Sequence, residues 1–268
     1  KNYRTNKKNK SNLNTDKPLI SVVMPSFNQA KYIERSILSV LNQDYPNKEL
    51  IIIDGGSKDG TIEILKKYDS YIKYWVSEKD KGQSDALNKG FKMCSGEIYC
   101  WLNSDDLFLP MAFSNAVIEL SKKDKEICYG DWVYIDENDS VIDKYFAFDV
   151  NVNHLKYEGF HFSADSIFWH KSVHENFSGF DIKLNKTMDY QMLLEFALKQ
   201  PSSAFIRTEN SSDYSSSILT IQGDRTTTNN TYNLARRLPF LKIKAQRKYP
   251  VEIVVSIESM KVYHQYQS

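Results

Sequence analysis

The chain has 268 residues, 41% of them hydrophobic, which is enough to bury the core of one α/β domain with an appendage. Its formal net charge is +1, so nothing in the overall charge favours a nucleic-acid partner. The three cysteines lack metal-ligand spacing, no apolar run approaches the roughly 18 residues of a membrane span, and no signal peptide is visible, so we expect a cytoplasmic protein rather than a secreted or membrane-spanning one.

Strands and helices alternate in the first part of the chain, after a lead-in over residues 1–16 that is polar, basic and predicted to be disordered. Short apolar runs predict four buried strands, at residues 19–24, 49–53, 72–76 and 98–102. The segments between them have a helical period, at residues 30–41, 59–68 and 82–93. This order predicts an α/β fold, in which a mostly parallel sheet has helices on both faces.

The pattern is more mixed after Pro110. Helices are predicted at residues 112–120 and 188–199, strands at 127–129, 132–135 and 166–169, and a further strand within 141–148 that could pair with its predecessors. The Ser-rich stretch 202–217 is predicted to be a loop. Residues 234–266 alternate basic and apolar side chains, which predicts a basic, helical C-terminal extension over residues 222–268.

Two adjacent carboxylates, Asp105 and Asp106, follow the strand at 98–102. Open α/β sheets bind ligands at the carboxyl ends of their strands. Carboxylate pairs there suit a hard divalent cation, Mg²⁺ or Mn²⁺, that shares its coordination with a substrate phosphate. The alternative is that the two acids only cap the helix that follows.

Polar side chains also follow the first two strands. The segment Pro25-Ser26-Phe27-Asn28 could form a shelf for a planar base, or else a tight turn with a core Phe. Asp54 could accept hydrogen bonds from a ribose hydroxyl or a base N–H, or else shape its own loop as an Asx-turn.

The third strand is followed by Asp80-Lys81-Gly82. Lys81 could contact a phosphate, and the helix that begins after Gly82 could present its amides to an anion. The alternative is a solvated turn capped by Asp80. All of these segments are expected to meet at one edge of the sheet.

The four segments, in this order, resemble family-2 glycosyltransferases of the GT-A fold over roughly residues 18–200. The resemblance rests on 25–28, Asp-Gly-Gly-Ser-Lys-Asp-Gly-Thr at 54–61, Asp-Lys-Gly…Asn-Lys-Gly at 80–90 and Leu-Asn-Ser-Asp-Asp at 102–106. It implies a nucleotide-diphosphate-sugar donor, with a UDP-sugar preferred, a Mn²⁺ or Mg²⁺ ion on its pyrophosphate and inversion at the anomeric carbon. It also implies a nucleotide-sugar-binding half at 17–110 and an acceptor-binding half at 111–221.

The resemblance assigns roles to individual residues. Asp189, after a Ser-Gly-Phe-Asp segment at 178–181, matches the catalytic base, although a favourable first-turn acid is the alternative. Asp105 and Asp106 match the metal ligands. The implied donor contacts are Pro25, Ser26, Phe27, Asn28, Asp54, Lys81, Ser84, Asn103 and Ser104.

The acceptor candidates are His161, Asp165, Trp169, His170 and Asp181; the alternatives are a core Trp at position 169 and a surface residue at position 170. The chain departs from the family pattern at Asn103, which replaces the first acid of the Asp-x-Asp motif, at Gly55, where many members have an Asp, and at Leu87, where many have an Arg.

These features predict an inverting glycosyltransferase that moves a sugar to a hydroxyl of a saccharide or lipid-linked acceptor, in the synthesis of a surface polysaccharide or glycan. The alternatives are a non-catalytic module that binds nucleotide-sugars or saccharides, and a sugar nucleotidyltransferase, which would need a Gly- and Arg/Lys-rich loop after the first strand. The basic C-terminal segment could make peripheral contact with an anionic membrane at its inner face, or could be a solvated helix packed on the domain.

Overall fold

The computed structural model describes residues 17–136, 140–147, 155, 163–184, 187–200, 204–208, 220–222, 244–246 and 252–254. The predicted lead-in at 1–16 and the acceptor candidate His161 lie outside these residues.

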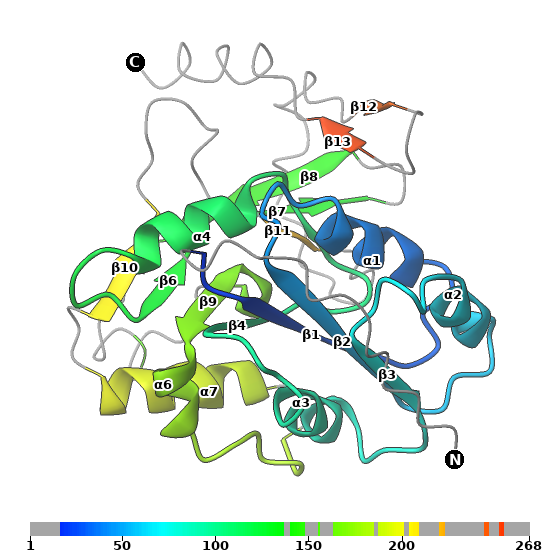
Figure 1. Ribbon diagram of the computed structural model, residues 1–268, viewed down its shortest axis with the longest axis horizontal. Helices are drawn as coiled ribbons and strands as arrows, with labels where there is room; N and C mark the ends of the chain where they lie inside the picture. Colours follow the sequence, from blue (N-terminus) through cyan, green and yellow to red (C-terminus); the bar gives the residue numbers. More distant parts are fainter. Residues whose placement is uncertain are drawn as a thin grey trace.

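A seven-stranded sheet forms the centre of the molecule, in the order β10-β6-β9-β4-β1-β2-β3 (Figure 1). Strands β4, β1, β2 and β3 are mutually parallel, whereas β9 runs antiparallel to both β4 and β6. The predicted mostly parallel sheet is therefore confirmed. The strands are β1 Ile20–Ser26, β2 Lys48–Asp54, β3 Tyr74–Ser77, β4 Ile98–Trp101, β6 Ile127–Tyr129, β9 Ile167–His170 and β10 Phe205–Arg207.

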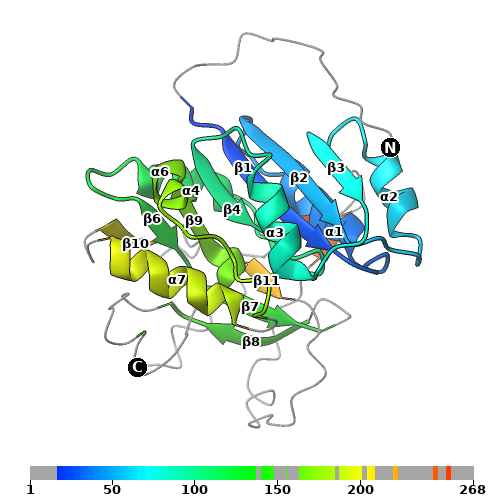
Figure 2. The same cartoon turned by 90° about the horizontal axis from the view of Figure 1, so that it is seen from below.

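Helices cover both faces of this sheet (Figures 1 and 2). Alternate residues of a strand point to opposite faces, so Val22 and Met24 join one apolar cluster and Val23 joins the other. The first cluster is closed by α1 Ile33–Leu41, α2 Thr61–Lys67 and α4 Ala112–Leu120. The second is closed by α3 Gln83–Phe91, α6 Lys171–Glu175 and α7 Met188–Lys199.

A smaller sheet has the order β5-β11-β7-β8, with β5 Leu107–Phe108, β11 Thr220–Gln222, β7 Trp132–Ile135 and β8 Val141–Tyr145. Strands β7 and β8 pair antiparallel, which confirms the pairing predicted for residues 141–148. Because β5 comes six residues after the end of β4 (101 to 107), this sheet begins beside the acid pair.

Two predictions of secondary structure need correction or remain open. The loop predicted at 202–217 contains β10, which pairs in parallel with β6 through Phe205 and Ile127. A buried phenylalanine makes this short run a strand despite the Ser-rich sequence around it. Within the predicted helical extension at 222–268, the residues described beyond β11 form an antiparallel pair, β12 Lys244–Gln246 and β13 Glu252–Val254; the rest lies outside the described residues.

Candidate active site

The strand ends meet at one edge of the sheet, as predicted. Ser26 at the end of β1 lies opposite Asp54 at the end of β2, and Asp54 lies opposite Ser77 at the end of β3. On the other side of β1, the N–H of Leu102 donates to the carbonyl of Val23 (3.0 Å), which carries the chain toward the acid pair beside the same edge. Parallel pairing therefore brings the four segments together.

The loops after β1 and β2 are hydrogen-bonded to each other. Asn28, in the left-handed region at φ 53°, donates its N–H to Ser57 Oγ (2.7 Å) and accepts the N–H of Lys58 at Oδ1 (3.0 Å). The N–H of Ala30 donates to Asp59 Oδ2 (2.9 Å). The Asn28 side chain thus organises the loop pair, and its predicted contact with the donor stays a prediction.

Asp54 is fully buried, and its carboxylate is used within its own loop. It accepts the N–H groups of Gly56 (3.0 Å) and Ser57 (2.8 Å) and the hydroxyls of Ser57 (2.5 Å) and Ser77 (2.6 Å). These are the contacts of an Asx-turn, the alternative for this residue. Direct contact between Asp54 and a nucleotide stays a prediction and would require the carboxylate to leave some of these donors.

Ser26 and Phe27, at the end of β1, differ in their exposure to solvent. The Phe27 ring is 61% exposed, so it is not the core Phe of the alternative interpretation. A Cβ atom on Gly55 would lie 3.1 Å from this ring, so the glycine lets the ring pack closely on the β2 loop. The hydroxyl of Ser26 is buried, with no hydrogen-bond partner among the described residues. The exposed Phe27 ring is suited to pack against a planar ligand.

Asn103 is the centre of the acid cluster after β4. Its N–H donates to Asp165 Oδ1 (2.9 Å), and its Nδ2 donates to Asp106 Oδ2 (2.9 Å) and Asp165 Oδ2 (3.2 Å). Gln83, the first residue of α3, donates its Nε2 to Asn103 Oδ1 (2.6 Å). Asn103 therefore connects the β4 loop to both α3 and the segment before β9.

Asp106 and Asp165 are both buried, at 4% and 1% exposure. Burial, and then the neighbouring Asp165 and Asp105 carboxylates, raise the pKa of Asp106 well above its ordinary value. Asp106 therefore keeps its proton to a higher pH than an exposed aspartate does. Asp105, by contrast, is half-buried.

The donor set at this edge fits a divalent cation that depends on its substrate for ligands. Asp105 supplies a carboxylate with access to solvent, and the oxygens of Asp106 face Asn103 and Asp165. Across the described ranges, no three His, Cys, Asp or Glu side chains are grouped so that they could hold a metal alone. Mg²⁺ and Mn²⁺ are commonly bound by one or two carboxylates together with phosphate and water. Coordination by Asp105 or Asp106 stays a prediction.

Asp189 lies in the first turn of α7 and is half-buried. It precedes the buried Leu193 by four residues, so the two side chains share the inward face of the helix. Ser84 Oγ of α3 donates to the carbonyl of Leu184 (3.2 Å), five residues before Asp189. Figure 2 shows α7 running from the side of α3 toward β10, so its first turn lies on the α3 side. Gln83 at the start of that same α3 contacts Asn103, so α3 contacts both the acid cluster and Leu184.

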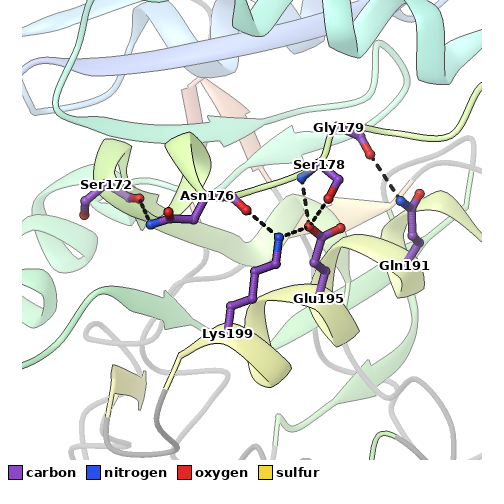
Figure 3. Close-up of polar contacts among 7 residues, drawn as sticks. All are labelled: Ser172, Asn176, Ser178, Gly179, Gln191, Glu195 and Lys199. Atoms are coloured by element: carbon purple, nitrogen blue, oxygen red, sulfur yellow. Dashed lines mark hydrogen bonds and ion pairs between the residues drawn. The ribbon is translucent and has the colours of Figure 1, made fainter.

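The segment before α7 is tied to this helix by polar contacts (Figure 3). Gln191 Nε2 donates to the carbonyl of Gly179 (3.1 Å). Glu195 Oε1 accepts the N–H (2.8 Å) and the hydroxyl (2.6 Å) of Ser178. Lys199 Nζ donates to the same Glu195 oxygen and to the carbonyl of Asn176 (2.6 Å). These contacts fix the position of α7 relative to the turn that precedes it.

Two acceptor candidates are corrected by the structure. Trp169 is fully buried in the apolar cluster, with its ring 5.5 Å from Phe196 and 5.6 Å from Phe91, so it is a core residue and cannot contact an acceptor. His170 pairs with Ile98 at the start of β4, the end of that strand away from the acid pair. Apolar clusters cover both faces of β9, which buries Trp169, and the antiparallel direction of β9 places His170 at the far end of β4.

The remaining residues predicted to contact the donor or the acceptor differ in their exposure to solvent. Lys81 and Asp181 are exposed, and Asp181 Oδ1 accepts the N–H of Lys183 (2.9 Å). Ser84 and Ser104 are buried, each with 3% of its surface exposed, and the Ser84 hydroxyl donates to the carbonyl of Leu184. Asp165 belongs to the acid cluster. The roles of these residues toward donor and acceptor stay predictions.

Comparison with known proteins identifies the family to which the chain belongs. A sequence model described as Glycosyl transferase family 2 matches residues 21–180. A UDP-Glc:alpha-D-GlcNAc-diphosphoundecaprenol beta-1,3-glucosyltransferase of Escherichia coli, WfgD, is 35% identical over 133 residues, which are 49% of this chain and 52% of that protein. The chain spans about half the length or less of the curated relatives it matches first.

Solved structures share the fold at low sequence identity. S. aureus TarS in complex with UDP-GlcNAc aligns with a TM-score of 0.60 at 17% identity, over 77% of this chain and 59% of that one. The mannosyltransferase PcManGT from Pyrobaculum calidifontis, in complex with GDP-Man and Mn²⁺, aligns with a TM-score of 0.58 at 17% identity, over 78% and 57%. With the family match extending over more than half of its residues, the chain belongs to glycosyl transferase family 2.

Proposed function

We propose that the chain is an inverting glycosyltransferase that moves a sugar from a nucleotide-diphosphate sugar, with UDP as the preferred nucleotide, to a hydroxyl of a saccharide or lipid-linked acceptor. The observation that supports the proposal is that β1, β2 and β3 end at one edge of the sheet, beside which the chain after β4 runs, and that α3 contacts both Asn103 and Leu184, five residues before Asp189. The names of the relatives support it, because WfgD is a UDP-glucose-dependent enzyme with a diphosphoundecaprenol-linked acceptor and TarS binds UDP-GlcNAc.

In this mechanism, Phe27 and Ser26 bind the nucleotide, and Asp105 would hold a Mn²⁺ or Mg²⁺ ion. When bound, the cation neutralises negative charge on the departing nucleotide diphosphate. Asp189 accepts the proton of the acceptor hydroxyl as its oxygen attacks the anomeric carbon. The bond from that carbon to the diphosphate breaks as the new bond forms on the opposite face, so the configuration is inverted.

The setting that we propose is the cytoplasmic synthesis of a surface polysaccharide or glycan. No helix among the described residues is long and apolar enough to cross a membrane. Peripheral membrane contact through 222–268 stays a prediction, because nearly all of that segment lies outside the described residues.

The experiment first identifies a donor and then removes the base. Thermal stabilisation by UDP-glucose, UDP-GlcNAc and GDP-mannose, each with Mn²⁺, ranks the donors. Nucleotide release and sugar transfer to saccharide and lipid-diphosphate acceptors are then measured with the best donor. Asp189→Asn is expected to lower kcat by about 10²–10⁴-fold, the contribution of a positioned base, with little change in UDP affinity.

Asp124→Asn is the matched control, since Asp124 is exposed in the turn before β6 and its left-handed backbone (φ 61°) suits Asn equally. Its kcat is expected to equal that of the wild type. Wild-type turnover in Asp189→Asn would show that another group is the base. Donor binding without any turnover in the wild type would favour the non-catalytic module instead.

A further inference from the structure

The segment between α6 and α7 is held by two helices at once. Residues 178–184 lie between α3, which begins at the acid cluster, and α7, which carries Asp189. We call these seven residues the connector. Its contacts explain how a residue of the acceptor-binding half is placed relative to strand ends of the donor-binding half.

Two side-chain amides bind four successive backbone groups of the connector. Asn88 of α3 donates Nδ2 to the carbonyl of Phe180 (2.7 Å) and accepts the N–H of Phe180 at Oδ1 (2.9 Å). Gln191 of α7 donates Nε2 to the carbonyl of Gly179 (3.1 Å) and accepts the N–H of Asp181 at Oε1 (3.1 Å). One helix therefore holds the connector at Phe180, and the other holds it on both sides of the same residue.

The local sequence is suited to this arrangement. Gly179 has φ 89°, a conformation that side chains other than glycine rarely adopt, and a Cβ atom there would lie 3.2 Å from Asn88 Oδ1. The side chain of Phe180 is 4% exposed and packs 5.1 Å from the ring of Trp101, the last residue of β4. The connector is thus anchored to the strand that leads to Asp105 as well as to both helices.

We infer that Asn88 and Gln191 are positioning residues, which couple the base-bearing first turn of α7 to the donor side of the site through the connector. Gln191 lies two residues after Asp189, so its side chain points away from that of Asp189 and toward the connector. The inference rests on the proposed function, because it assigns the amides a role in placing the base. Small displacements of a catalytic group, on the order of 1 Å, can lower a rate by about 10²-fold.

The test compares Asn88→Ala and Gln191→Ala with Asn176→Ala. Asn176 is exposed, and its side chain bonds only the carbonyl of Ser172 (3.0 Å) among the contacts in Figure 3, so it controls for loss of one amide near the connector. Hydrogen exchange over residues 178–192 is expected to accelerate in the two test variants and not in the control. With the donor that ranks first, kcat is expected to fall by about 10–100-fold while the donor KM changes by about twofold or less.

Conservative variants distinguish positioning from folding. Asn88→Asp and Gln191→Glu keep the acceptor oxygen and lose the donor, so they are expected to recover part of kcat. The kcat of a variant is compared with that of the wild type only if the two proteins have the same Tm. If an alanine variant unfolds, its conservative form is measured instead. Wild-type exchange and kcat in both alanine variants would overturn the inference, even if Asp189→Asn is inactive. An active Asp189→Asn would instead overturn the proposed base, while faster exchange would still support the connector.

Discussion

At the scale of single residues, the site depends on polar groups that bind one another rather than solvent. Asn103 takes the place of the first acid in the Asp-x-Asp motif, and its amide donates to both buried acids. An aspartate at 103 would add a further carboxylate beside Asp106 and Asp165 and would lose the amide donor, so the amide is the group that this pair of buried acids tolerates.

Asp106→Asn is expected to stabilise the protein at neutral pH. Because the pKa of Asp106 is raised in the folded state by burial and then by Asp165, the unfolded chain releases this proton first as pH rises past 3.8. The wild type therefore loses stability above that pH, and the variant does not. The Tm difference between variant and wild type should grow from pH 4 to pH 7, to a few degrees. An unchanged or lowered Tm at pH 7 would show that the ionised carboxylate is needed there.

At the scale of elements, α6 packs a histidine into an aromatic cluster under the sheet. The ring of His174 lies 4.6 Å from Phe91, 5.3 Å from Tyr99 and 5.8 Å from Phe177. Burial lowers the pKa of His174 from 6.5 to about 4, because the protonated ring would lose its hydration there. The short helix is therefore held by a neutral imidazole.

The contribution of His174 to stability should fall as pH decreases from 6.5 to 4, opposite in sign to that of Asp106. In this window the unfolded His174 binds a proton and the folded one does not, so protonation favours the unfolded chain. At about 1.4 kcal/mol per pKa unit, the loss reaches about 3 kcal/mol at most by pH 4. This prediction is tested by measuring the unfolding free energy of the wild type and of His174→Phe in urea at several pH values between 4 and 6.5. The difference in unfolding free energy between the two proteins should change with pH, and a constant difference would exclude His174 as the cause.

At the scale of the whole molecule, the site is shared by two parts of one sheet. Strand β9, from the predicted acceptor-binding half, lies between β4 and β6 and brings Asp165 against Asn103. The two halves predicted at 17–110 and 111–221 therefore share a continuous sheet. Their boundary stays a prediction.

Asp105→Ala is expected to abolish the metal dependence of nucleotide binding. If Asp105 holds the cation on the diphosphate, the wild type should bind UDP at least about tenfold more tightly with Mn²⁺ than with EDTA, which corresponds to about 1.4 kcal/mol. The variant should bind with the weaker affinity in both conditions. Calorimetry with UDP measures this, and EDTA-treated wild type is the control. An Asp105→Ala variant that still responds to Mn²⁺ would move the metal site to other ligands.

The sequence by itself determined the order of elements, the parallel strands β1 to β4 and the acids at their ends, because hydrophobic period and turn residues are local signals. It also carried the family, through motifs that match in order. It did not determine which polar side chains meet. The pairing of Asn103 with Asp165, the packing of Trp169 on Phe91 and the binding of the connector by Asn88 and Gln191 join residues 10–92 positions apart. Only the tertiary structure decided these contacts, because the antiparallel direction of β9 and the packing of α3 and α7 leave no periodic signal in the chain.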